Sequence, residues 1–327
     1  MAPSVPVVGL DLGHAHFRAG VGYADGGRVH ILGVASVPAA GVERGAIVDE
    51  AQLAHATERV LRDARRLAGA AGNLPVVVGV GGALWKNWVE AGGPEADLER
   101  ARYFSRLLRA DVEAVVPTAE AAARAVLFPA ERSARAAVLD IGEASTDVVV
   151  FDDREPVLCG VVPVAGRHVT NDIACGLQVS REEAERLKRR YGAAVRELAP
   201  PVCFGGGKGG SGPELFEIVE ARVAELLELA AEQLSSALGG VLPERVILTG
   251  GSALLAGLQQ AAQRMLGVPT RIGVAQGTVG PADVVTSPAC AGVIGLLYEV
   301  AAAAPAANGA ARKGVFDSVR QWLKEFL

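Results

Sequence analysis

Short apolar runs separated by glycine open the chain. Pro6–Leu12, Gly20–Tyr23 and His30–Ser36 alternate or run apolar, with glycine-containing turns between them. This spacing predicts an antiparallel meander of three strands. Asp49–Leu67 follows with apolar residues at helical spacing and ends near Gly69, which predicts an amphipathic helix.

The rest of the chain alternates between short apolar runs and longer segments of helical spacing. Strands are predicted at Val76–Val80, Val157–Val164 and Arg245–Thr249, and a hairpin at Leu139–Phe151. Helices are predicted at Leu98–Leu108, Ala119–Leu127, Ile173–Tyr191, Glu214–Leu238 and Cys290–Val300. Strands that alternate with helices indicate an α/β protein.

One local pattern occurs twice. Val8-Gly-Leu-Asp-Leu-Gly13 and Val138-Leu-Asp-Ile-Gly142 each bring an Asp to the end of an apolar strand and follow it with glycine. The backbone N–H groups of such a turn can bind phosphate oxygens, while the carboxylate holds a hydrated Mg²⁺. The repeat therefore predicts two similar halves with one phosphate-binding turn in each.

A third element completes the pattern. Ile247-Leu-Thr-Gly-Gly-Ser252 is typical of a strand, a double glycine and the start of a helix. Backbone there can approach a flat ligand closely, and the N-terminus of a helix favours an anion. The second turn also carries two acids, Glu143 and Asp147, that a buried hairpin does not need.

This ordered set of motifs resembles the actin, heat-shock-chaperone and sugar-kinase ATPase superfamily. Asp11–Gly13 matches the first phosphate motif, Asp140–Asp147 the second, and Leu248–Leu254 the adenosine motif. The resemblance implies an α/β, actin-like (ribonuclease H-like) two-lobed ATPase fold. It also implies ATP or ADP with Mg²⁺ as cofactors.

Within the superfamily the chain resembles the bacterial cell-division family FtsA. The resemblance is carried by Gly41–Asp49, Pro163–Ala174, Glu182–Gly192 and Glu220–Glu225. It covers nearly the whole chain outside residues 81–112. PilM, a family of pilus-assembly proteins, shares several of these motifs and stays the alternative.

The resemblance implies a division of the chain into five parts. They are a first lobe at 1–160 completed by 285–300, a shortened inserted subdomain at 81–112 within it, a second lobe at 161–284, a linker at 301–313 and a terminal helix at 314–327. Trp85 and Trp88 in the shortened subdomain are read as local core packing rather than as a partner anchor.

The same resemblance assigns roles to twelve cofactor-binding residues. Asp11 and Asp140 hold Mg²⁺ through water. The remaining residues meet the phosphates (Gly13, Gly142, Thr146), the ribose and adenine side (Glu185, Lys188) or the adenosine (Gly250, Gly251, Ser252), with Arg18 as a compensating cation and Gly166 beside them. The alternative for Glu185 and Lys188 is a solvated ion pair one helical turn apart, worth a few tenths of a kcal/mol.

Several positions depart from the family pattern. His14-Ala-His16 replaces the hydroxyl residue that usually follows the first motif, and Ala144 adds a Cβ to the second turn. Glu143 lies where its charge would repel a nucleotide unless it faces Mg²⁺ or water.

The position that activates water in many polymerising relatives is Val116 here, which cannot orient water. Glu120 is a poor substitute on the same helical face. We therefore expect at most weak ATPase activity. The rivals to this interpretation are an enzyme of the sugar-kinase type and a nucleotide-free scaffold.

The last segment, Gly314–Leu327, has one apolar helical stripe. The stripe contains Phe316, Val319, Trp322, Leu323 and Phe326, and Arg and Lys lie opposite. This pattern favours an interfacial helix on an anionic membrane over a helix packed on the protein's own core.

Composition and charge limit the partners and the cellular location that we expect. The formal net charge of −5 argues against a nucleic-acid partner, and four cysteines without paired spacing indicate reduced thiols in the cytoplasm. No run approaches the roughly 20 apolar residues of a membrane span. The family resemblance then implies a peripheral protein on the cytoplasmic face of the cell membrane at the division site. The resemblance also implies binding of the FtsZ C-terminal tail and self-association.

Overall fold

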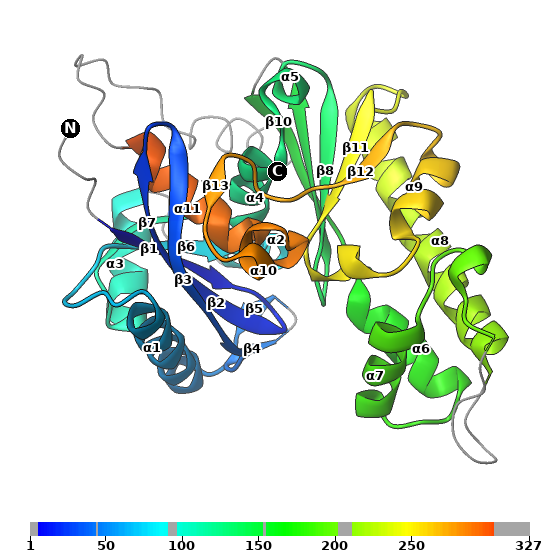
Figure 1. Ribbon diagram of the computed structural model, residues 1–327, viewed down its shortest axis with the longest axis horizontal. Helices are drawn as coiled ribbons and strands as arrows, with labels where there is room; N and C mark the ends of the chain where they lie inside the picture. Colours follow the sequence, from blue (N-terminus) through cyan, green and yellow to red (C-terminus); the bar gives the residue numbers. More distant parts are fainter. Residues whose placement is uncertain (1–5, 44, 91–96, 153–154, 202–210, 304–327) are drawn as a thin grey trace.

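Two β-sheets form the framework of the protein. A computed structural model describes residues 6–43, 45–90, 97–152, 155–201 and 211–303. One sheet has six strands and the other has five. They lie in two lobes with helices α4 and α11 drawn between them (Figure 1).

The first sheet has the strand order β13-β3-β2-β1-β6-β7. Its strands are β1 (Val7–Leu12), β2 (His16–Asp25), β3 (Arg28–Pro38), β6 (Val76–Val80), β7 (Val112–Pro117) and β13 (Thr278–Val279). Strands β1 to β3 form an antiparallel meander, and β6 and β7 extend it in parallel from β1. The predicted meander is therefore confirmed.

The second sheet repeats this plan with the order β10-β9-β8-β11-β12. Its strands are β8 (Ala136–Ile141), β9 (Thr146–Asp152), β10 (Glu155–Val162), β11 (Arg245–Thr249) and β12 (Thr270–Ile272). A meander of three strands is again extended by two parallel ones. Each lobe consequently places one Asp at the end of the first strand of its meander, here called the founding strand: Asp11 on β1 and Asp140 on β8.

Helices cover the sheets and bury their apolar stripes in two main cores. In the first lobe they are α1 (Glu50–Leu67), α2 (Gly82–Glu90) and α3 (Asp97–Leu108), and a small hairpin of β4 (Val42–Glu43) and β5 (Ala46–Ile47) joins them. In the second lobe they are α6 (Gly166–Gly176), α7 (Arg181–Tyr191), α8 (Gly212–Ala237) and α9 (Leu258–Leu266). Trp85 is 6% exposed within the first core, as expected.

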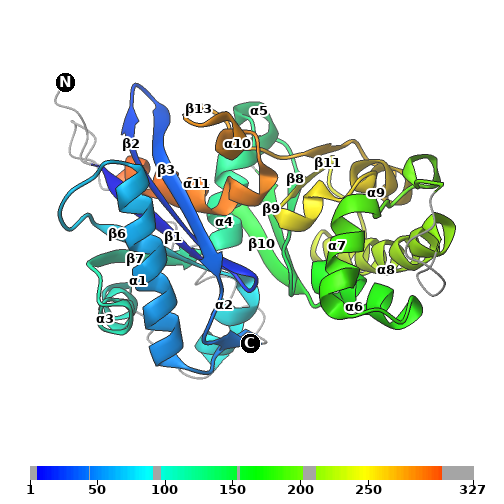
Figure 2. The same cartoon turned by 60° about the horizontal axis from the view of Figure 1, so that its bottom comes forward.

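Two further helices connect the lobes, α4 (Thr118–Val126) and α11 (Ala291–Ala303). Figure 2 shows them crossing next to both sheets. The crossing is close because α11 presents Gly295 to the backbone of α4. A Cβ at Gly295 would lie 2.3 Å from the carbonyl carbon and oxygen of Ala121.

The structure corrects several expectations about boundaries. Sheet membership places β8 and β9 in the second lobe, earlier than residue 161, and returns the chain to the first sheet at β13, before residue 285. The single helix expected at Ile173–Tyr191 is two, because Gln178 has a φ of 53° and Ser180 caps α7 by accepting the N–H of Glu183.

Further corrections concern the linker and the turn after β11. Helix α11 continues through residues 301–303 of the expected linker, and residues 82–90 of the shortened subdomain form helix α2. After Gly250 the chain makes one 3-10 turn, Gly251–Leu254, and α9 begins only at Leu258. The prediction that an α-helix begins directly after the double glycine was therefore wrong.

The predicted terminal helix, with Phe316, Val319, Trp322, Leu323 and Phe326, lies outside the described residues. None of the helices in the described part combines the length and apolar character that a membrane crossing requires.

The crossing of α4 and α11 gives a test of the fold. Gly295→Val forces a branched side chain against the Ala121 carbonyl, so we expect a loss of about 1 to 3 kcal/mol in the free energy of unfolding. Ala221→Val, on the exposed face of α8, is the control and should cost less than about 1 kcal/mol. Urea denaturation of both variants measures the difference, and equal losses would contradict the tight crossing.

Candidate functional site

A cavity of about 550 Å³ lies where the two lobes meet. Both acid-tipped turns line it, together with α7, the 3-10 turn after β11 and the start of α11. Eleven of the twelve predicted cofactor-binding residues line it: Asp11, Gly13, Arg18, Asp140, Gly142, Gly166, Glu185, Lys188, Gly250, Gly251 and Ser252. Cavities of this size commonly bind cofactors.

The first acid, Asp11, is 8% exposed at the end of β1. Burial raises the pKa of its carboxyl, while the cross-strand neighbour Arg18 and a hydrogen bond from Thr118 oppose the rise. Thr118, the first residue of α4, donates its hydroxyl to Asp11 Oδ1 at a distance of 3.2 Å. The connecting helix therefore fixes one oxygen of the carboxylate.

The second turn brings two more acids to the same cavity. Burial, together with the charges of Asp147 and Asp11, raises the pKa of Asp140 to about 7. Burial raises the pKa of Asp147 to about 6, although the Gly82 N–H donates to its Oδ2 at 2.7 Å. Three acids thus lie in a desolvated space where their ionised forms are unfavourable together.

This arrangement fits a magnesium-bound phosphate. A cation between the turns would offset the repulsion among the carboxylates, and Asp11 and Asp140 are the groups that would hold it. Among the described residues, no three His, Cys, Asp or Glu side chains are arranged to bind a metal ion alone. Mg²⁺ commonly keeps its waters and relies on substrate phosphates, so a dedicated protein cage is not required.

Glu143 does not present an uncompensated charge. Its Oε1 lies 3.0 Å from Arg181 Nη2 and 3.8 Å from Arg167 Nε. Both arginines come from the second lobe, one at the start of α6 and one at the start of α7. The expected repulsion of a nucleotide is therefore reduced by neighbouring positive charge.

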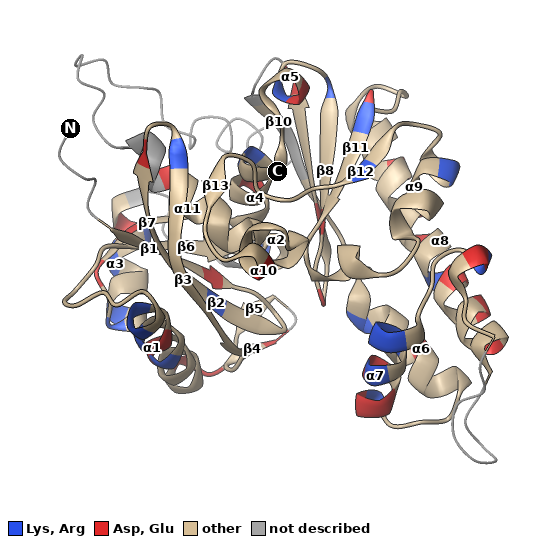
Figure 3. Cartoon of the chain, in the orientation of Figure 1, with Lys and Arg blue, Asp and Glu red and all other residues tan. Residues whose placement is uncertain are grey.

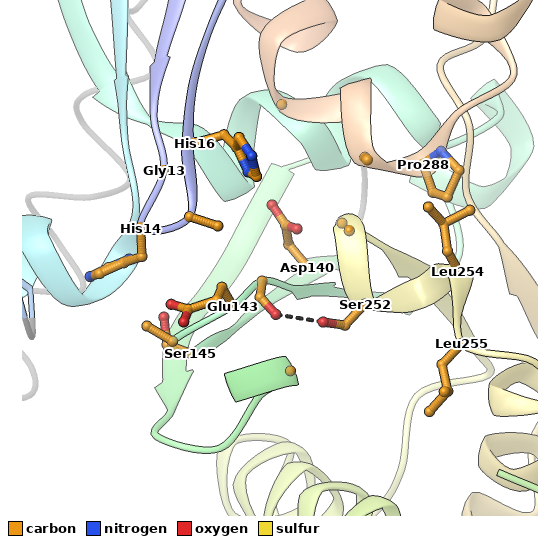
Figure 4. A pocket seen from close by; sticks show the side chains of 18 of the residues that line it. Gly13, His14, His16, Asp140, Glu143, Ser145, Ser252, Leu254, Leu255 and Pro288 are labelled. Atoms are coloured by element: carbon orange, nitrogen blue, oxygen red, sulfur yellow. Dashed lines mark hydrogen bonds between the residues drawn. The ribbon is translucent and has the colours of Figure 1, made fainter. Parts of the chain in front are cut away.

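The turn predicted to bind adenosine, Gly250–Ser252, packs directly on the second phosphate turn. We call it the adenosine turn. The Ser252 hydroxyl donates to the Gly142 carbonyl at 2.7 Å, a contact drawn in Figure 4, and the Gly166 N–H donates to the same oxygen at 3.2 Å. Gly250 has a φ of 86°, and a Cβ there would lie 2.3 Å from Asp140 Oδ1. Only glycine allows this approach.

Glu185 and Lys188 lie on one face of α7 and close this side of the cavity. Lys188 Nζ lies 2.6 Å from Glu185 Oε2 and donates to the Gly166 carbonyl at 3.0 Å and the Thr170 hydroxyl at 2.8 Å. Burial opposes ionisation of Glu185, but hydrogen bonds from Lys188 and Thr170 outweigh it and lower its pKa. Figure 3 shows both signs of charge interspersed along α7. The pair is thus part of the site wall rather than a solvated surface pair.

The twelfth predicted residue, Thr146, does not reach the cavity. It is fully buried, and its hydroxyl donates to the Val164 carbonyl at 2.8 Å. Side chains alternate along a strand, so Ser145 and Asp147 face the cavity and Thr146 faces the core. Ser145 takes the position expected of Thr146.

Thr118 and Gly292 are among the lining residues that the sequence analysis missed. Thr118 follows Pro117 at the start of α4, and Gly292 on α11 leaves space beside Asp11. Sequence spacing alone does not bring positions 11, 118 and 292 together.

Neither candidate for water activation lines the cavity. Val116 is buried in β7, and Glu120 is 1% exposed and paired with Arg124 at 2.9 Å. The geometry therefore gives Glu120 a structural ion pair instead of a catalytic position.

Comparison with known proteins agrees with this geometry. The family model for Cell division protein FtsA matches residues 137–295. A curated FtsA from Pseudomonas aeruginosa is 33% identical over 57% of this chain and 47% of its own length. FtsA from Bacillus subtilis is 26% identical over 79% of this chain and 76% of its own.

This chain is similar in sequence to FtsA proteins. It spans about half the length of the first curated FtsA proteins that it matches, 47% for Pseudomonas aeruginosa and 53% for Rhizobium meliloti. The relationship rests most firmly on the half of the chain that contains the second phosphate turn and the adenosine turn.

Solved structures show the same actin-like fold. A PilM–PilN type IV pilus biogenesis complex aligns with a TM-score of 0.68, 18% identity and coverage of 90% of this chain and 98% of that chain. MreB5 of Spiroplasma citri bound to ADP aligns with a TM-score of 0.62, 16% identity and coverage of 90% and 95%. The predicted fold class is thereby confirmed.

The raised pKa of Asp140 gives a test of the FtsA-like site. The ordinary pKa is 3.8 and the folded one about 7, so ionisation in the folded protein lowers stability as the pH rises between these values. Asp140→Asn removes this cost. Without nucleotide, we expect the variant to be more stable than wild type by about 1 to 3 kcal/mol near pH 8.

This advantage should shrink toward about pH 3, below the ordinary pKa of 3.8, where the wild-type carboxyl is mostly protonated in both states. Urea denaturation across this pH range measures it, with the exposed Asp25→Asn as the control. A difference that does not change with pH would contradict the buried, charge-coupled site.

Proposed function

We propose that this protein is an FtsA-like adaptor that binds ATP or ADP with Mg²⁺ in the cavity between its lobes. The observation that carries the proposal is the meeting of both acid-tipped turns and the adenosine turn at one cavity. Asp11 and Asp140 would hold the hydrated cation, and the turn backbones at Gly13 and Gly142 would bind phosphates.

On the adenosine side, Lys188 and Glu185 would face the ribose and adenine, and Gly250–Ser252 would lie against the base. The cation supplies charge neutralisation for the phosphates when it is bound. Because Val116 and Glu120 are both buried away from the cavity, nucleotide acts chiefly as a ligand that closes the lobes and promotes self-association, with at most weak hydrolysis.

The adaptor role also needs a membrane contact and a filament contact. The stripe of Phe316, Val319, Trp322, Leu323 and Phe326 would insert into the cytoplasmic face of an anionic membrane. The second lobe would bind the C-terminal tail of FtsZ. Its α6 and α8 come from the stretches that resemble FtsA, and Arg222 joins them through two hydrogen bonds to Asp172, at 2.5 Å and 3.0 Å.

A PilM-like scaffold is the second candidate. It is favoured by the TM-score of 0.68 to the PilM–PilN complex. Binding to FtsZ filaments separates the two proposals, because a pilus scaffold would have no reason to sediment with them.

Nucleotide binding is tested by calorimetric titration with ATP. We expect saturable binding that requires Mg²⁺ and is abolished by EDTA. Lys188→Met should weaken it about tenfold, since a charge-assisted contact is worth about 1.5 to 3 kcal/mol.

Arg186→Met on the same helix is the matched control, because Arg186 pairs with Glu183 and does not line the cavity. Equal affinity of wild type and Lys188→Met, or no heat with wild type at millimolar nucleotide, would overturn the assignment of the site.

The adaptor role is tested by liposome co-sedimentation. We expect the intact chain, but not one ending at Ala310, to bind vesicles containing anionic lipid and to bring FtsZ filaments with it. Neutral vesicles and FtsZ without its C-terminal tail are the controls. Vesicle binding that survives truncation would contradict the role of the terminal helix, and failure to carry FtsZ would favour the pilus scaffold.

A further inference from the structure

Gly45, at the tip of the β4–β5 hairpin, is held through both of its backbone groups. Its N–H donates to His14 Nε2 at 3.1 Å, and its carbonyl accepts from Asn87 Nδ2 at 2.9 Å. His14 belongs to the first phosphate turn and Asn87 to α2. One residue of a surface hairpin therefore connects the phosphate turn with the helix that replaces the larger inserted subdomain.

The contact leaves no room for a side chain at Gly45. Its φ is 75°, and a Cβ would lie 2.9 Å from the backbone of Ala83 and from Asn87 Nδ2. The hairpin tip thus packs on the first turn of α2, and glycine is required for both the conformation and the approach.

The first residue of α2 contacts the second phosphate turn. Gly82, the first residue of α2, donates its N–H to Asp147 Oδ2 at 2.7 Å. Asp147 stands opposite Asp140 on the neighbouring strand, and both line the cavity. A carboxylate at the N-terminus of a helix is stabilised by the unpaired N–H groups and by the helix dipole.

We propose that these contacts form one positioning unit, the α2 bridge, made of His14, Gly45, Asn87, Gly82 and Asp147. It links the two phosphate turns from opposite lobes and sets their separation. His14 and Asn87 are positioning residues for the first turn, and the hairpin tip responds when a phosphate group occupies the cavity. This inference rests on the proposed nucleotide site.

The chemistry of His14 suits this role. An imidazole that accepts a hydrogen bond at Nε2 is neutral and carries its proton on Nδ1. Burial lowers the pKa of His14, while Glu143 opposes the shift and Arg167 adds to it. The acceptor lone pair of His14 is thus committed to the hairpin tip instead of to a ligand.

The test compares two substitutions that differ in one acceptor atom. His14→Gln keeps an oxygen near the place of Nε2, whereas His14→Leu keeps the size and loses the acceptor. We expect His14→Leu and Asn87→Ala each to weaken MgATP binding about three- to tenfold, and His14→Gln to restore most of it. The double variant should lose less than the product of the two single losses, because both act through Gly45.

Hydrogen exchange of the Gly45 amide in the nucleotide-free protein is the second readout. It should become faster in His14→Leu and Asn87→Ala but not in His14→Gln, and nucleotide should slow it in wild type. Losses that multiply independently, equal effects of Leu and Gln, or unchanged Gly45 exchange would overturn the α2 bridge. Absence of nucleotide binding by wild type would instead overturn the proposed function, and exchange would still report on the Gly45 contacts.

Discussion

The unfavourable proximity of buried carboxylates is the constraint on which the site depends. Asp11, Asp140 and Asp147 reach one cavity from two sheets, and their pKa values are raised by burial and, for Asp140, also by the neighbouring acids. A stable core would avoid such a group of acids. Their retention is understandable if a cation and a phosphate complete the charge balance when the lobes close.

The duplicated sheet explains how one cavity can be assembled from distant residues. Each meander delivers an acid to the end of its founding strand, and the two founding strands face the same space. Crossing helices α4 and α11 then hold the sheets together, and Thr118 on α4 bonds directly to Asp11. Fold and site therefore share the same contacts, so that a change in the angle between lobes changes the site.

Patterns of short range were read correctly from the sequence. Val76–Val80 and Arg245–Thr249 have the bounds expected, and α1 begins after Asp49, which caps it by accepting the Gln52 N–H. The glycine and acid motifs identified lining residues of the turns such as Gly13 and Asp140, whereas Glu185 and Lys188 on α7 came from the family resemblance. The division of Ile173–Tyr191 was missed because apolar spacing continues across the break, although Ser180 and Glu183 have cap spacing.

Other features depended on three-dimensional contacts that one sequence does not contain. Thr146 was placed one residue off because the strand alternation that turns it into the core begins only where β9 pairs with β8. His14 appeared as a missing hydroxyl, and its partner Gly45 lies 31 residues away. The lobe boundary was set too late because the sequence pattern of β8 and β9 does not show which of the two sheets they join.

The close crossing at Gly295 and Ala121 has a mechanical consequence. With a separation that would leave only 2.3 Å between an added Cβ and the opposite carbonyl, the two helices have no space to slide into one another. Scissor-like rotation about this crossing is the movement that keeps the contact intact. Gly295 is therefore the contact about which we expect the two lobes to rotate when the angle between them changes.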